Sequence, residues 1–196
     1  MKLWDSRFQE GLDKFIEEYT ESISFDHKLL EEDITGSIAH LKMLNKCGIV
    51  NDEEYAKIEK ALLEILEEGK KIEKFPIEYE DIHTWVESKL KEKVGNIAGK
   101  LHTARSRNDQ IVLDEKLYIR RKIKEIVNEL EELQKTIIEH AEREIDALLP
   151  AYTHLQHAQP ISLAFHLMAY FYMFERDIDR FKTTLKRHNK CPLGSA

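Results

Sequence analysis

Positively charged side chains gather in one stretch of an otherwise acidic chain, residues 101–110, with the sequence LHTARSRNDQ. No carboxylate occurs between Glu92 and Asp109, although the 196-residue chain carries a net charge of -7. The basic residues in and before this stretch are Lys93, Lys100, Arg105 and Arg107. Such a local excess of positive charge favours a small anion, because a carboxylate or phosphate gains charge-assisted hydrogen bonds there.

Two interpretations of these residues are open from the sequence. Asn108 is of a type that caps helices, and the free N–H groups and dipole at a helix start bind anions. Arg105 and Arg107 add planar guanidinium groups, each able to hold a carboxylate by two hydrogen bonds. In the alternative, Asn108 is only a cap and the arginines pair with neighbouring acidic helices.

A second polar cluster, residues 153–159, comes just before a long apolar run. His154 is a candidate general acid or base, because an imidazole titrates near neutral pH and Thr153 and Gln156 could orient its ring. The alternative is a buried histidine whose hydrogen bonds are satisfied. His154 and His157 are spaced to face a metal ion, but no carboxylate or cysteine completes the ligand set, so we predict no metal site.

Helices must position both clusters, and we predict an all-α protein. The chain has only seven glycines and four prolines, and its apolar residues recur at steps of three and four. Both clusters are expected at helix starts, and Asn51 with Glu54 predicts a capping box. His83, near a helix start, is expected to cap or pack. A short first helix carries on one face Phe8, Leu12, Phe15, Ile16 and Tyr19. Later helices are predicted at about 26–44, from Asn51 to Pro76, after Glu80, from Asn108 to Pro150, and from near Pro160 onward.

The helix pattern divides the chain into a small amino-terminal helical domain, residues 1–104, and the incomplete start of a long-helix bundle, residues 105–196. A helix from Asn108 to Pro150 would be roughly 60 Å long, which suits a bundle wall and favours oligomerisation. No charged residue occurs in 147–174, which predicts an interior segment or a subunit interface.

Composition excludes several protein classes. The two cysteines, Cys47 and Cys191, lie far apart and indicate reduced thiols rather than a disulfide framework. The amino terminus lacks the pattern of a signal peptide, and the longest uncharged apolar run is too short to span a membrane. An acidic balance argues against general binding of nucleic acid. We therefore expect a cytoplasmic protein that binds neither membranes nor nucleic acid.

Five segments together resemble the argininosuccinate lyase family in order and spacing. They are SISFDHKL at 22–29, DIHTWVE at 81–87, KLHTARSRNDQ at 100–110, THLQHAQP at 153–160 and CPLGSA at 191–196. Within the wider fumarase and aspartase superfamily, RSRNDQ is the specific marker, whereas THLQ fits several members. The resemblance covers the whole chain but only the amino-terminal part of the family, less than half of its usual length.

The resemblance implies reversible β-elimination of argininosuccinate to arginine and fumarate, with no metal or organic cofactor. It implies that Ser22, Asn108 and Thr153 bind substrate and that His154 takes part in proton transfer. Ser106 and Arg107 would lie with Asn108 where negative charge develops, which suits a reaction that passes through an aci-carboxylate dianion. Two further residues, His83 and Gln156, are expected to support the site.

The family's mobile loop, of the form GSSxMPxKxNP, contributes a catalytic serine and a lysine and does not occur in this sequence. We therefore expect the 196 residues to be an amino-terminal fragment that is inactive by itself. Family members are homotetramers whose active sites each draw on three chains, so self-association is expected. The alternatives are a non-enzymatic crystallin-like or assembly module and an enzyme resembling adenylosuccinate lyase.

Overall fold

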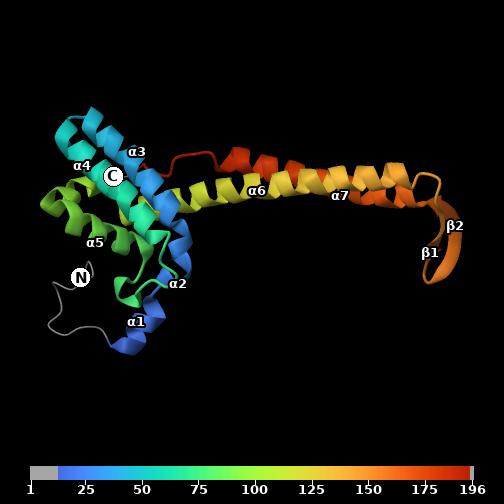
Figure 1. The fold of residues 1–196 in the computed structure, drawn as a ribbon, viewed down its shortest axis with the longest axis horizontal. Helices are drawn as coiled ribbons and strands as arrows, with labels where there is room; N and C mark the ends of the chain where they lie inside the picture. The colour runs from blue at the N-terminus through green and yellow to red at the C-terminus, as the bar shows by residue number, and fades with distance from the viewer. Residues whose placement is uncertain (1–12, 195–196) are drawn as a thin grey trace. The chain divides into compact units, whose positions relative to one another are not determined.

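A computed structural model of the chain describes residues 13–194 and shows a helical protein with one short β-hairpin (Figure 1). The all-α prediction is confirmed. The described residues form two compact units, one of residues 13–118 with 191–194 and the other of Ile119–Lys190. The division into domains 1–104 and 105–196 stays a prediction. No helix within the described range has the length and hydropathy needed to cross a membrane.

The first unit is built from helices and short 3-10 turns. Its elements are α1 (Lys14–Thr20), α2 (Ile23–Asp26), η2 (His27–Leu29), α3 (Leu30–Lys46), α4 (Asp52–Gly69), η3 (Ile77–Tyr79), α5 (Ile82–Val94), η4 (Gly95–His102) and the start of α6 (Arg107–Arg143). The helix predicted at 26–44 is thus divided between α2, η2 and α3. Phe15, Ile16 and Tyr19 of the predicted first helix are exposed on α1, whereas Phe8 and Leu12 lie outside the described residues.

The capping box that opens α4 is confirmed. The side chain of Asn51 accepts a hydrogen bond from the Glu54 amide at 2.9 Å, and the Glu54 carboxylate accepts one from the Asn51 amide at 3.1 Å. The helix ends at Gly69 rather than at Pro76, so that boundary was wrong. The chain turns away earlier because the Lys71 and Ile72 amides bond to carbonyls only three residues back.

The core of the first unit lies among α3, α4 and α5. Asp81 caps α5 by accepting from the Thr84 amide at 2.6 Å, and this helix turns Ile82, Val86 and Leu90 inward as its spacing predicted. The aliphatic residues that α3 and α4 bury completely, with an exposed fraction of 1% or less, are Ile34, Leu41, Leu44, Ile58, Leu62 and Ile65.

The start of α6 differs from the sequence prediction. Ser106, not Asn108, stands before the helix: its hydroxyl accepts from the Asn108 amide, and the Asp109 carboxylate accepts from the Ser106 amide, both at 3.2 Å. Serine is as good a cap as asparagine, and an acidic residue three positions later completes a reciprocal pair. The predicted Asn108 cap was therefore wrong by two residues. The helix also ends at Arg143, before Pro150.

A two-stranded antiparallel hairpin occupies the segment where we predicted helix. Its strands are β1 (Leu148–Thr153) and β2 (Gln156–Ser162), and α7 (Leu163–His188) follows. His154 and Leu155 both have positive φ, 51° and 62°, as a two-residue type I′ turn requires. The predicted helix start at Pro160 was wrong, since the Ser162 hydroxyl caps α7 by accepting from the Phe165 amide at 3.1 Å.

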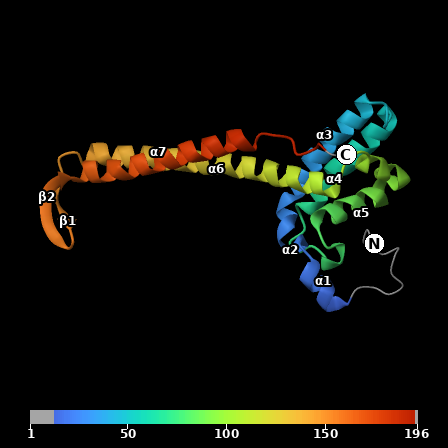
Figure 2. The ribbon, with the colours of Figure 1, turned by 180° about the vertical axis from the view of Figure 1, so that it is seen from behind.

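The second unit pairs α6 with α7, which lie side by side in both views (Figures 1 and 2). Ile123 and Val127 of α6 pack with Ile178 of α7, and the Gln134 amide donates to the Phe171 carbonyl at 3.1 Å. Within this single chain the uncharged stretch 147–174 has no buried residue, so the interior-segment interpretation was wrong. Its interpretation as a subunit interface stays a prediction.

Gly36 lets α6 approach α3 closely. A Cβ atom at this position would lie 3.1 Å from Cδ2 of Leu113 and 3.2 Å from Oδ1 of Asp114. Both distances are tighter than ordinary van der Waals contact, so the absence of a side chain is what admits the first turns of α6.

We expect Gly36→Ala to lower the free energy of unfolding by about 1–2 kcal/mol. This reverses the usual effect, because alanine normally stabilises a helix interior by about 1 kcal/mol relative to glycine. Urea denaturation measures the change. Gly99→Ala is the matched control, since a Cβ there meets nothing within 4 Å. An unchanged or raised midpoint for Gly36→Ala would contradict the close approach.

Candidate functional site

Arg107 is held at the start of α6 by two side chains. Its Nη2 lies 2.7 Å from Oε2 of Glu87 on α5, and its Nη1 donates to Oε1 of Gln110 at 2.9 Å. Its Nε is buried and has no acceptor among the described residues. Arg107 thus pairs with one glutamate, but α5 carries three lysines against two glutamates and is not an acidic helix. The alternative in which the arginines pair with acidic helices is met only by this one ion pair, and Arg107 still has a hydrogen-bond donor to spare.

Arg105 lies deeper, in the loop before α6. Its Nη1 donates to the Ser37 hydroxyl at 3.2 Å, and its Nε is also without an acceptor in the described part of the chain. Burial lowers the pKa of Arg105, while the nearby carboxylates of Asp33 and Asp114 act in the opposite direction. Ala104 before it has a φ of 56°, so the backbone is strained where it enters this segment.

Ser106 and Asn108 are exposed at the same helix start. The free N–H groups and positive dipole end of a long helix lie beside them, so an anion is favoured at this surface. The structure therefore brings Ser106, Arg107 and Asn108 together as neighbours on one accessible turn.

Beneath this turn lies a buried polar cluster, of which the sequence motifs indicate only one member. His83 from α5 has Nδ1 3.2 Å from Oδ1 of Asp33 on α3 and 3.4 Å from Oδ2 of Asp114 on α6. The Gln110 amide also donates to Oδ1 of Asp33. His83 was expected to cap or pack, and it does lie in the interior. Asp33, Gln110 and Asp114 were missed.

The two carboxyl groups of this cluster differ in acidity. Burial would raise the pKa of Asp33, but hydrogen bonds from His83 and Gln110 and the charge of Arg105 outweigh it, so that pKa lies below its usual value. Burial raises the pKa of Asp114 to about 9, and the negative charge of Asp33 adds to the effect. Asp33 is thus the more acidic of the two carboxyl groups and Asp114 the less acidic.

The cluster is also the group of side chains that could hold a cation. Asp33, His83 and Asp114 each offer one ligand atom, and these atoms lie within 4.8 Å of one another. The guanidinium of Arg105 lies close enough to influence both carboxyl groups, and its positive charge opposes a second cation.

Ser22 lines a separate cavity of about 460 Å³ in the same unit, together with Asp26, Asp81 and His83. The Ser22 hydroxyl donates to Oδ2 of Asp26 at 2.6 Å, and its amide donates to the Glu80 carbonyl at 2.7 Å. Burial raises the pKa of Asp26, against the effect of its hydrogen bonds with Ser22 and the Ile82 amide. Ser22 and His83, predicted from distant segments, therefore line one cavity.

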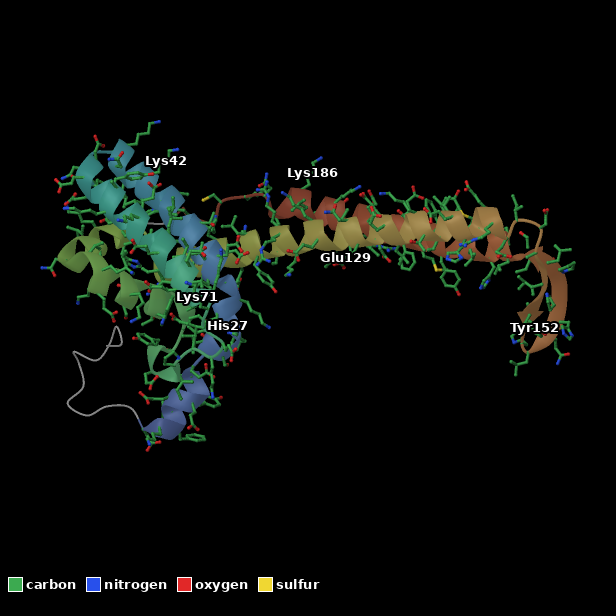
Figure 3. All side chains as sticks on the ribbon, viewed as in Figure 1. His27, Lys42, Lys71, Glu129, Tyr152 and Lys186 are labelled. Carbon is green, nitrogen blue, oxygen red and sulfur yellow. The ribbon has the colours of Figure 1, made fainter. Side chains whose placement is uncertain are left out.

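Thr153, His154 and Gln156 belong to the second unit, where they form the turn of the hairpin. Thr153 pairs with Gln156 across the strands, and His154 occupies the turn with positive φ. Tyr152, labelled in Figure 3, belongs to the same hairpin. Its hydroxyl lies 2.9 Å from Nε2 of His157. His154 is exposed, so the interpretation as a buried histidine was wrong, as was the placement of this cluster at a helix start.

Comparison with known proteins then identifies the family. A family model described as lyase matches residues 6–196. The chain belongs to this lyase family.

Curated relatives of the chain include the argininosuccinate lyases of Geobacillus sp. (strain WCH70), 50% identical over 196 residues, and of Bacillus subtilis (strain 168), 49% identical over 194 residues. The matches cover 99% and 98% of the chain but only 42% of each relative. The chain thus spans less than half the length of these relatives. The family resemblance stated from the motifs is confirmed.

The fold of the chain is also found among solved structures. An EDDS lyase variant with bound fumarate aligns with a TM-score of 0.78 at 26% identity, covering 93% of this chain and 35% of that one.

We expect His83→Leu to lower the free energy of unfolding by about 3–5 kcal/mol, because it leaves the buried Asp33 carboxylate without a main donor. His83→Asn should recover much of this loss, since its amide nitrogen can take the place of Nδ1. Thermal unfolding compares the two variants.

The exposed His188→Leu serves as a control and should change stability by no more than about 0.5 kcal/mol. If His83→Leu were no less stable than His83→Asn, the hydrogen bond to Asp33 would not be what His83 contributes.

Proposed function

We propose that this lyase chain forms part of an argininosuccinate lyase, which converts argininosuccinate reversibly to arginine and fumarate. The observation that carries the proposal is its identity of about 50% to curated argininosuccinate lyases along almost its whole length. Further support comes from the EDDS lyase variant, which has fumarate, the product of such an elimination, bound to it.

The start of α6 suits the demands of this reaction. Elimination removes a proton beside a carboxylate and builds negative charge on it, so preformed N–H donors lower the barrier most where that charge develops. Ser106, Arg107 and Asn108 supply such donors around the end of a helix dipole. Because Ser106 makes the cap, the Asn108 side chain is not needed for it and can bind substrate.

The remaining roles follow the family match. Ser22 and Thr153 bind substrate, His154 takes part in proton transfer, and His83 and Gln156 support the site. His154 lies on an exposed hairpin turn, where its imidazole is accessible to a ligand. The reaction needs no metal or organic cofactor, because guanidinium and amide donors stabilise the dianion.

We expect the 196-residue chain to release no fumarate by itself, because it lacks the loop serine and lysine of the family. The test compares it with a longer polypeptide in which it is joined to the remaining part of the Geobacillus relative. The longer polypeptide should release fumarate from argininosuccinate, and chromatography measures the fumarate formed. Release by the short chain would contradict the need for the loop, and preference for a succinylated nucleotide would contradict the substrate.

In that longer polypeptide, Asn108→Ala should lower kcat/KM at least about tenfold, equivalent to roughly 1.4 kcal/mol of transition-state stabilisation. Lys42→Ala is the control, since Lys42 is exposed on α3 (Figure 3) and should leave kcat/KM unchanged. Equal values of kcat/KM for the two variants would contradict a role of Asn108 in binding substrate.

We also propose that the second unit self-associates, as in a homotetramer. The support is a concentration of exposed apolar side chains in the hairpin and α7, because exposed apolar patches often mark protein–protein contacts. The exposed large residues there are Leu148, Tyr152, Leu155, Phe165, Tyr170, Tyr172 and Met173.

Phe165→Glu should weaken this association at least about tenfold, because Phe165 is 69% exposed in the single chain and its burial would desolvate a charge. Sedimentation over a range of concentrations measures it. Tyr19→Glu, at an exposed aromatic residue of α1, is the matched control. A clean monomer at high concentration, or equal weakening by both variants, would contradict the proposal.

A further inference from the structure

Two carboxyl groups from different helices are buried side by side beneath the start of α6. Asp33 on α3 is 0% exposed and Asp114 on α6 is 1% exposed. One oxygen of each lies within 4.8 Å of the other and of Nδ1 of His83. Two ionised carboxylates at this separation repel each other strongly when water is excluded, so the interior must neutralise one of them.

The hydrogen bonds show which atoms lack partners. Oδ1 of Asp33 accepts from both His83 and Gln110. Oδ2 of Asp33 and both oxygens of Asp114 have no hydrogen-bond partner within residues 13–194, apart from the 3.4 Å contact between His83 and Asp114. A proton on Asp114 supplies a donor to this cluster, in which Oδ2 of Asp33 is an acceptor that has no other partner within residues 13–194.

The surrounding charges agree with one ionised carboxylate rather than two. Arg105 from the loop before α6 contributes a positive charge, His83 faces the pair from α5, and Glu32 on α3 adds a negative charge. The single positive charge of Arg105 cannot balance Glu32 together with two ionised aspartates. Burial raises the pKa of Asp114 to about 9, whereas the pKa of Asp33 is lowered by His83 and Gln110.

We propose that Asp114 carries a proton that it shares with Asp33, and that this buried pair positions Arg107 through the side chain of Gln110. The inference does not depend on the lyase activity proposed above. Asp114 is in this view a positioning residue that contacts no substrate.

The link to Arg107 runs through one amide. An ionised Asp33 can only accept hydrogen bonds, so the amide nitrogen of Gln110 must face it. The amide oxygen of Gln110 is then left to accept from Nη1 of Arg107 at 2.9 Å. Placing the proton on Asp114 rather than Asp33 therefore fixes the orientation of Gln110, and Gln110 fixes one side of the guanidinium.

Infrared spectroscopy tests the proton directly, because a protonated carboxyl group has a carbonyl band distinct from that of a carboxylate and the band shifts in deuterium oxide. We expect this band in the unmutated protein at neutral pH and its loss as the pH rises through about 9. Asp114→Asn, which has the shape of the protonated acid, should abolish the band. Glu129→Gln, at an exposed position of the same helix, should leave it.

The pH dependence of stability gives a second measurement. The folded protein keeps the Asp114 proton up to about pH 9, whereas the unfolded chain loses it above the usual pKa near 3.8. Unfolding then releases a proton, so rising pH destabilises the unmutated protein between these values. Relative to Asp114→Asn, its unfolding equilibrium constant should grow up to about tenfold per pH unit across this window.

The positioning role has its own readout in the Nε–H resonance of Arg107 measured by NMR. It should be unchanged in Asp114→Asn, which still donates to Asp33, and displaced in Asp114→Ala, which cannot. Should either variant fail to fold, the infrared band of the unmutated protein and its titration still show whether the cluster holds a protonated carboxyl group.

Two results would overturn the proposal. Absence of the band would mean that both carboxylates are ionised and that the proton resides on the His83 imidazole. A stoichiometric divalent cation in the purified protein, found by elemental analysis and lost in Asp114→Asn, would mean that the cluster binds metal instead.

Discussion

The first unit depends on the burial of ionisable side chains from three helices at one point. Asp33 comes from α3, His83 from α5 and Asp114 from α6, and each is almost inaccessible to water. Desolvating such groups costs several kcal/mol each, so the helices can pack only where the groups satisfy one another. Two helices joined by apolar contacts can shift slightly against each other, but such a shift would break a hydrogen bond to a buried carboxylate. The cluster therefore sets the register of α6 against α3 and α5.

The buried cluster also fixes side chains at the accessible start of α6. Gln110 is anchored by Asp33 and holds Arg107, while Glu87 holds the guanidinium from the other side. The cap is made by the Ser106 hydroxyl, which accepts from the Asn108 amide, and by the Asp109 carboxylate, which accepts from the Ser106 amide. This division of tasks leaves the Asn108 side chain uncommitted on the exposed turn. A correction to the predicted cap thus strengthens the case for Asn108 as a ligand-binding residue.

Local patterns in the sequence predicted the helices and the α4 capping box, because spacing and caps act within one or two turns of chain. The motifs predicted the family and placed Ser106, Arg107 and Asn108 on one turn. The buried acids were missed because Asp33 lies on the apolar stripe of α3, and only contacts with α5 and α6 show how its charge is accommodated. The hairpin was missed for a different reason. His154 and Leu155 do not predict a type I′ turn from sequence, because such turns favour asparagine, aspartate and glycine at these two positions and leucine rarely adopts positive φ.

If the second unit self-associates as proposed, assembly and chemistry would share one surface. Two paired helices can bury only the stripe between them, here Ile123, Val127 and Ile178, so other apolar residues remain in water. The exposed residues concentrate in the hairpin and the first half of α7, the region that also carries Thr153 and His154. Leu155, at the turn itself, is 93% exposed. A neighbouring subunit that covered these residues would exclude water around His154 and support its strained turn. Because water exclusion strengthens hydrogen bonds and charge interactions, self-association would then prepare the imidazole for proton transfer rather than only add stability.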